Sequence, residues 1–429
     1  MSMNTPGSAN TPAPKKKNKG CLPIILIFLA FVVAGIIGSQ KMNKDDNGSS
    51  AASPTVTFRN YVTATRSPAA QSTKLTSYPA SPTASVWNSY DSSLHYFYAQ
   101  LDYKEKSAFS CRYDAIALGR GNQWDISGFN LSSRQLERVK LAIEWDCPEL
   151  MNASFYTRLF NFYNSADVNG RYTYFENYAS EMRSMLSRAD SALNSIRYRS
   201  EWGYSDYEKL LAYDRYVVKN CYYLLDNDGP EGTLHLDGDY RAPYSALVNG
   251  YAVCEGYARS TCYAMRRFGI PCIYVHGPTG SGHHAWNMVK TDGQWYQYDA
   301  TWNDSNDDGR YIDYLPYFNI TDERMYRSRS LDGEYAAYGF SMPRCTSTSA
   351  NYYYKNGQYV GSNWASVVPG LIRSAYNRGQ RYLGVMMANQ SSFDAMLYSL
   401  KNDSKLYVQD VKYSYVANEK ALFFYLIFR

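Results

Sequence analysis

The stretches VCEGYARSTCYAMRRFGIPCIYVHG (253–277) and GHHAWNMVKTDGQWYQYDATWND (282–304) gather the reactive side chains of this 429-residue chain. They hold three of its eight cysteines and three of its five histidines. Apolar residues recur at helical spacing after Cys254, and Gly269 and Pro271 stop the pattern. We therefore predict a helix that begins at Cys254, a buried strand over CIYV and a loop over GPTGSG.

Two further strands follow, joined by an Asp-Gly pair that is a strong two-residue turn signal: HAWNMVKT (284–291) and QWYQYDATW (294–302). The turn sets a register in which Trp286 faces Asp299 and His284 faces Thr301. His284 and Asp299 would then be diagonal neighbours on one face of the hairpin, within reach of a hydrogen bond.

A cysteine at a helix start beside an imidazole and a carboxylate has the layout of a nucleophilic triad. The positive end of the helix dipole favours a thiolate at Cys254, and Gly256 leaves room for another chain near the sulfur. Cys254 would attack a carbonyl carbon and His284 would carry the proton. Asp299 would orient the imidazole and stabilise its charged form.

Three blocks of the sequence carry a family resemblance: YSALVNGYAVCEGYA (244–258), HAWNMV (284–289) and WYQYDATWND (295–304). In order and spacing they resemble the signature blocks of the transglutaminase-like superfamily, a branch of the papain-like thiol enzymes. The resemblance implies an α+β core with a helix packed on an antiparallel sheet. It also implies acyl transfer from glutamine side chains or peptide bonds, through a thioester, to an amine or water.

Each of these residues also has a structural interpretation. Cys254 could be a core thiol or a disulfide partner, and His284 could be a structural histidine. Asp299 could be a turn or cap residue, which is disfavoured because it falls inside a predicted strand. His283 is expected to be exposed, and the family blocks do not point to His276. Packing is the favoured role of four nearby aromatic residues: Tyr244, which could instead assist an oxyanion, Trp286, Trp295 and Trp302.

No metal or cofactor is expected. The cysteines and His284 in these stretches lack the paired CxxC spacing of a zinc site. DSNDDG (304–309) copies the first half of a calcium loop, but the twelfth position is Leu315 where a bidentate glutamate is needed.

The start of the chain predicts a membrane anchor. The apolar stretch 21–38 has no charged residue and is long enough, at roughly 27 Å, to cross a bilayer core. Lysines before it predict a cytoplasmic tail over 1–20 and an extracellular position for everything after it. A cleaved secretory signal is the alternative and would leave the protein secreted. The next stretch, 39–85, is rich in Ser, Thr, Ala and Pro and reads as a disordered tether.

Charge argues against a nucleic-acid partner. The formal net charge is +5, and the first fifty residues carry +4 of it, so the rest of the chain is close to neutral. Outside the anchor stretch seven cysteines remain. An odd number outside the cytosol leaves at least one thiol unpaired and allows up to three disulfides.

Flanking units are predicted on both sides of the core over 236–327. A helical unit over 86–235 includes SSRQLERVKLAIEW with its serine cap, FENYASEMRSMLSRADSALNSI, and a stretch from Gly203. A small α+β unit covers 328–429. It contains a hairpin at NYYYKNGQYVG (351–361), two helices, and strands over RYLGVMMA, KLYVQDVKYSY and ALFFYLIF.

The sequence therefore favours a membrane-anchored extracytoplasmic thiol enzyme that acts on protein or peptide amides, with catalytic residues Cys254, His284 and Asp299. One alternative is a cysteine protease or amidase that uses the same triad with water as the acceptor. The other is a non-catalytic cell-surface binding module that keeps the fold.

Overall fold

The computed structural model describes residues 92–119, 126–150, 168–199, 202–224, 239–280, 282–304, 314–402 and 406–429. All of them belong to one compact unit, Pro82–Arg429. The tail, anchor and linker predicted over 1–85 lie outside the described residues, as does most of the calcium-like stretch over 304–309. Among the described helices, none is both long and apolar enough to span a bilayer.

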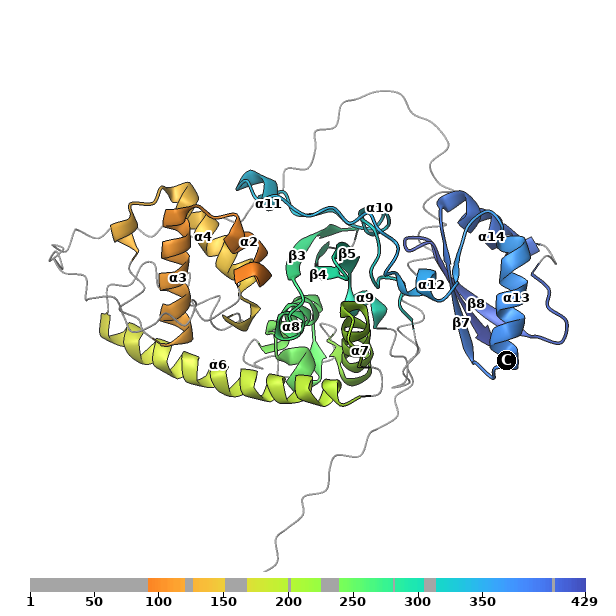
Figure 1. Ribbon diagram of the computed structural model, residues 1–429, viewed down its shortest axis with the longest axis horizontal. Helices are drawn as coiled ribbons and strands as arrows, with labels where there is room; N and C mark the ends of the chain where they lie inside the picture. Colours follow the sequence, from red (N-terminus) through yellow and green to blue (C-terminus); the bar gives the residue numbers. More distant parts are fainter. Residues whose placement is uncertain are drawn as a thin grey trace, which may run out of the picture. The chain divides into compact units, whose positions relative to one another are not determined.

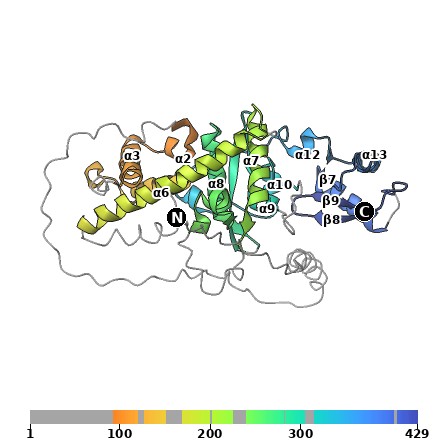
Figure 2. The same cartoon turned by 90° about the horizontal axis from the view of Figure 1, so that it is seen from below.

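Helices dominate the described part of the chain before residue 221. The longer ones are α3 (Tyr103–Ala117), α4 (Ser133–Asp146), α6 (Val168–Arg197, Figure 2) and α7 (Asp206–Asn220). Shorter turns accompany them: η2 (Ser92–Leu94), α2 (Tyr96–Ala99), η4 (Ser127–Phe129) and η5 (Pro148–Leu150). The predicted serine cap of α4 is confirmed, since Ser132 and Gln135 form a reciprocal capping box.

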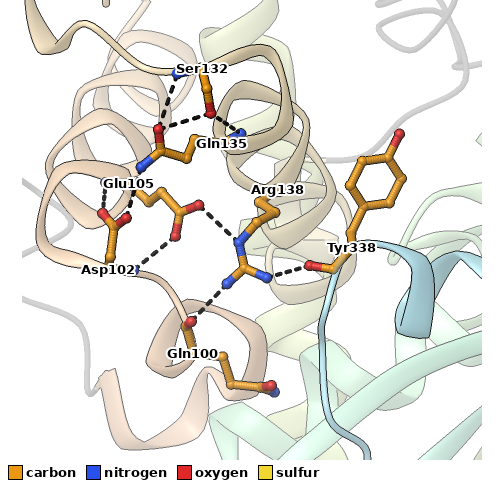
Figure 3. Close-up of polar contacts among 7 residues, drawn as sticks. All are labelled: Gln100, Asp102, Glu105, Ser132, Gln135, Arg138 and Tyr338. Carbon is orange, nitrogen blue, oxygen red and sulfur yellow. Dashed lines mark hydrogen bonds and ion pairs between the residues drawn. The ribbon is translucent and has the colours of Figure 1, made fainter.

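A polar network ties the first helices to a much later segment (Figure 3). The Arg138 guanidinium pairs with Glu105 at 2.8 Å and donates to the carbonyl oxygens of Gln100 and Tyr338. Glu105 is also the reciprocal partner in the capping box of Asp102, at the start of α3. The helical region is thus fastened to the chain that follows the core.

The central element is α8 (Cys254–Arg267), packed on a three-stranded antiparallel sheet (Figure 1). The strands are β3 (Cys272–Thr279), β4 (Gly282–Thr291) and β5 (Gln294–Tyr298). The helix begins at Cys254 as predicted, and Gly269 follows it with a φ of 78°. The loop predicted over GPTGSG (277–282) is shorter than expected, because β3 continues through Thr279 and β4 begins at Gly282.

The predicted hairpin register is confirmed as far as Tyr298, which pairs with Asn287. The second strand was predicted to continue to Trp302, and this is wrong. It ends at Tyr298 because the next residue, Asp299, caps the short helix α9 (Ala300–Asn303). Asp299 therefore does not face Trp286, and Thr301 does not face His284.

A two-stranded parallel sheet precedes α8. β1 (Tyr222–Tyr223) pairs with β2 (Tyr251–Ala252), so that Tyr223 lies opposite Ala252, two residues before Cys254. Between them lie the turns η6 (Asp239–Arg241) and η7 (Ser245–Asn249).

The chain after the core forms a four-stranded sheet in the order β6-β7-β9-β8, with two long helices (Figure 1). The elements of this part are α10 (Asp322–Met325), α11 (Glu334–Ala337), α12 (Tyr352–Lys355), β6 (Tyr359–Val360), α13 (Trp364–Asn377), β7 (Tyr382–Met387), α14 (Gln390–Asn402), β8 (Tyr413–Asn418) and β9 (Phe423–Phe428). The hairpin predicted over 351–361 is wrong, because α12 and a strand parallel to β7 occupy it.

Two hydrophobic clusters form the core. One runs without interruption from the N-terminal helices through α8 and the central sheet to one face of β9, including Phe423 and Tyr425. The other lies between the opposite face of the C-terminal sheet, which includes Phe424 and Leu426, and the helices α13 and α14. Alternate residues of β9 thus join the two clusters.

Candidate active site

Cys254 occupies the first position of α8 and is partly exposed as a free thiol. No side chain caps this helix, so its first-turn N–H groups are available at the sulfur. A Cβ at Gly256 would lie 2.3 Å from the carbonyl oxygen of Tyr240 and 2.4 Å from Ser245 Oγ. The backbone that approaches at Gly256 therefore belongs to this chain's own 240–245 segment.

His284 and Asp299 meet directly. His284 lies on β4, and its Nε2 is 2.8 Å from Oδ2 of Asp299. The other carboxylate oxygen, Oδ1, accepts from the backbone N–H of Trp302 and so caps α9. Asp299 is thus both a cap residue and the partner of His284, and its capping bond fixes which oxygen faces the imidazole.

The protonation of the pair follows from its surroundings. Burial acts to lower the pKa of His284, but the charge and hydrogen bond of Asp299 and a hydrogen bond with Cys254 outweigh it and raise the pKa. Burial acts to raise the pKa of Asp299, yet His284 and Arg329 together lower it to about 2. Nε2 of His284 bonds Asp299, so Nδ1 is the ring nitrogen left for Cys254.

Arg329 is a fourth residue at this site that the sequence did not indicate. Its Nη1 forms an ion pair with the same Oδ2 of Asp299 that receives His284. The guanidinium carbon lies 3.9 Å from the ring centroid of Trp302, 5.1 Å from that of Trp286 and 5.4 Å from that of Tyr317. The carboxylate is therefore held between two cationic side chains, one of them inside an aromatic cage.

Tyr223 is a fifth residue, brought to Cys254 by the pairing of β1 with β2. Tyr223 is 40% exposed, and it lies close enough to Cys254 for that residue to influence its pKa. Burial and the neighbouring thiol raise the pKa of Tyr223 to about 12, so the hydroxyl keeps its proton near neutral pH.

The remaining residues that the sequence singled out have simpler surroundings. His283 is exposed, and His276 lies 3.9 Å from the carboxylate of Asp332, away from the His284 pair. Tyr244 is buried. Trp286 is also buried and donates to Gln297, while Trp295 packs edge-on against Tyr96.

The seven cysteines within the described residues are all free thiols. Two of them, Cys262 and Cys272, bring their sulfurs to 3.4 Å from each other behind the site. Among the described residues, no three His, Cys, Asp or Glu side chains are grouped as a metal site would require.

Residues 196–300 match the model of the transglutaminase-like superfamily. The matched segment contains Cys254, His284 and Asp299, but ends before Arg329. The α+β core with its antiparallel sheet is accordingly transglutaminase-like.

Solved structures give partial likenesses. One is a TGase crystal structure, at 16% identity and a TM-score of 0.23, covering 34% of this chain and 38% of the other. Another is a candidate cysteine protease from Cytophaga hutchinsonii, at 15% identity and a TM-score of 0.23, covering 35% of this chain and 45% of the other. The match thus spans less than half of either protein, and likenesses this partial say nothing about activity. No curated protein matches the chain.

Proposed function

We propose that this protein is a thiol enzyme that transfers acyl groups from protein or peptide amides through a thioester on Cys254. The observation that carries the proposal is the His284–Asp299 hydrogen bond beside the thiol of Cys254 at the start of α8, where that thiol helps to raise the pKa of His284. Members of the transglutaminase-like superfamily are generally cysteine-dependent enzymes, which supports the assignment.

In the first half-reaction the sulfur of Cys254 attacks the amide carbon and His284 holds the thiol proton. The C–N bond then breaks, and His284 gives the proton to the departing nitrogen, which leaves as ammonia or an amine. In the second half-reaction an amine or water gives a proton to His284 and attacks the thioester, which releases Cys254. The raised pKa of His284 suits a group that must carry a proton between these steps.

The oxygen of the attacked carbonyl gains negative charge and needs donors. The backbone at the start of α8 supplies N–H groups, and Tyr223 supplies a hydroxyl that is protonated at neutral pH. We assign Tyr223, and not the buried Tyr244, as the side chain that stabilises this oxygen, because the pairing of β1 with β2 brings the half-exposed Tyr223 beside Cys254.

The test is to incubate the full chain with a library of glutamine peptides and a labelled primary amine, and to measure product masses. Incorporation of the amine identifies transamidation, a gain of about 1 Da identifies deamidation, and peptide cleavage identifies a protease. Cys254→Ser should abolish every product. Full turnover by that variant would exclude the thioester, and the absence of products from the wild-type protein would favour the binding module.

The place of action is a further part of the proposal. We propose that residues 21–38 anchor the chain and that the folded unit works outside the cell membrane, on the strength of the uncharged stretch and the lysines before it. Protease added to right-side-out membrane vesicles should digest the folded unit. Protection of that unit until the vesicles are opened would contradict the orientation.

A further inference from the structure

Arg329 contacts the candidate triad but is not one of the three residues predicted from the sequence. Arg329 lies in the segment after α10 and reaches Asp299 across the sheet, 30 positions away in the chain. The segment is fixed on the edge of β3 by two backbone bonds: Ser330 N–H to Pro278 O at 3.2 Å, and Asp332 N–H to His276 O at 3.0 Å. Its place is therefore set by the fold and not by the candidate triad.

We propose that Arg329 is a positioning residue for this site. It holds the Asp299 carboxylate in the orientation that hydrogen-bonds His284, and its positive charge partly offsets the negative charge of that carboxylate at the imidazole. This inference rests on the proposed function of the Cys254 site. Arg329 lies outside the segment that matches the superfamily model, so the match does not assign it.

The geometry supports a positioning role over a salt bridge of general stability. Arg329 is 5% exposed and Asp299 is 1% exposed, so the pair is screened little by solvent. Three aromatic rings hold the guanidinium, which leaves the carboxylate a single orientation. Arg329 Nη2 is buried and has no hydrogen-bond partner among the described residues, so Nη1 and its bond to Asp299 account for the polar contact that the terminal guanidinium nitrogens make at this site.

The electrostatic consequence has a definite sign. Asp299 raises the pKa of His284 and the charge of Arg329 lowers it. The other groups around His284 are Cys254 on α8, the protonated hydroxyl of Tyr223 on β1, and Lys420, whose Nζ lies 5.9 Å from the Trp302 ring centroid. None of them replaces the contact that Arg329 makes with Oδ2. Removal of Arg329 should therefore raise the pKa of His284.

The test compares R329M, which keeps bulk but removes charge, with R329K, which keeps charge but loses the planar fork. The readout is the titration of His284 by NMR of histidine-labelled full-length protein, with the signal assigned by its loss in H284N. We expect R329M to shift the His284 midpoint to higher pH and R329K to leave it near the wild-type value. Both should reduce kcat by tenfold or more, because Asp299 is less firmly held.

A midpoint that is unchanged or lower in folded R329M would overturn the proposal. If R329M does not fold, R329K decides, because wild-type kcat in that variant would show that the fork positions nothing. The titration needs no substrate, so its outcome is independent of turnover. Loss of turnover in C254S, by contrast, tests only the proposed function.

A second and independent inference concerns the buried cysteines Cys262 and Cys272, which lie behind the site. Cys262 lies in α8 and Cys272 begins β3, both are buried, and their sulfurs lie 3.4 Å apart. A disulfide needs about 2.05 Å between the sulfurs, so a movement of little more than 1 Å would join them. We infer that this pair forms a disulfide that covalently links α8 to β3 of the sheet.

Formation of the bond converts two thiols into one disulfide and releases two protons and two electrons. A small-molecule disulfide accepts the electrons and becomes two thiols. Both sulfurs are buried, so the exchange takes place while the protein folds. The other five described cysteines gain no partner by this step, which leaves Cys254 free for the proposed chemistry.

The test is to refold the full chain in a mixture of reduced and oxidised glutathione, block free thiols with N-ethylmaleimide in denaturant, and map the digest by mass. We expect a Cys262–Cys272 cross-linked peptide and a labelled Cys254, and in C272S a labelled Cys262. Quantitative labelling of both Cys262 and Cys272 in the refolded wild-type protein, or a link from either to another cysteine, would overturn the inference.

Discussion

At the scale of single residues, Asp299 has the most demanding position in the site. One of its carboxylate oxygens caps α9, and the other forms a hydrogen bond with His284 and an ion pair with Arg329. The sequence predicted Asp299 as a candidate catalytic residue but placed it inside a strand, because the local pattern did not mark where β5 ends. Arg329 could not be predicted, since no pattern near residue 329 reports a contact made 30 positions earlier.

Substitution of Asp299 by asparagine should separate charge from shape. An amide cannot stabilise an imidazolium as a carboxylate does, so we expect the pKa of His284 to fall and kcat to drop about a thousandfold. The rate should be measured across pH with the best substrate from the peptide library. D299N with more than a tenth of wild-type kcat would show that the carboxylate is not part of the mechanism.

The pKa shifts of His284 and Asp299 predict how the stability of the fold depends on pH. The pKa of His284 is raised on folding, so its contribution is full below its unfolded value near 6.5 and is lost as pH rises through the folded value. The pKa of Asp299 is lowered to about 2, so its contribution is full above about 4 and is lost as pH falls toward 2. The free energy of unfolding should be measured with denaturant at several pH values in wild type and H284N. The loss of stability as pH rises through the folded pKa of His284 should appear only in the wild type.

At the scale of elements, local signals predicted the helices and the central hairpin well. The Ser132 cap, the start of α8 and the register up to Tyr298 all follow from short-range chemistry. The Asn-Gly pair at 356–357 misled because Asn351 caps the backbone of α12 and Gly357, at a φ of 67°, ends that short helix. A helix end and a hairpin turn use the same residues there, and only the partner strand distinguishes them.

Substitution of Gly277 tests whether the edge of β3 holds the segment that carries Arg329 in place. A Cβ at this position would come within 2.0 Å of the carbonyl oxygen of Ser330, so Gly277→Ala must push the 330–332 segment away. We expect G277A to lower the thermal midpoint by several degrees and to reduce kcat at least tenfold. G280A is the matched control, because nothing lies within 4 Å of a Cβ there. Equal behaviour of the two variants would show that the edge is not rigid.

At the scale of the whole molecule, the predicted units are joined more closely than composition suggested. One hydrophobic cluster spans the helical region, the central core and part of the C-terminal sheet. The segment after residue 327, where the core was predicted to end, supplies Arg329 and borders β3. Contacts between distant segments were not readable from the sequence, because no local periodicity reports them.

Arg324 is the main polar link between the core and the C-terminal sheet. Its guanidinium donates to Ala421 O at 2.6 Å, Met387 O at 2.7 Å and Tyr359 Oη at 3.2 Å. We expect Arg324→Met to lower the free energy of unfolding by about 3 kcal/mol, because it leaves buried acceptors unpaired. Calorimetry should show a broadened or split transition, whereas R378M, at an exposed arginine, should match the wild type. An unchanged single transition in R324M would mean that apolar packing alone joins the parts.

The central claim is that folding couples the sulfur of Cys254 to the ring of His284, and thiol alkylation tests it without any substrate. The rate of iodoacetamide reaction at each cysteine should be followed by mass mapping at pH 6 in wild type and H284A. We predict that Cys254 reacts at least tenfold faster than Cys111, the other partly exposed cysteine of the folded unit, and that H284A removes this advantage. Equal reactivity among the thiols, or a Cys254 rate that H284A leaves unchanged, would contradict the account.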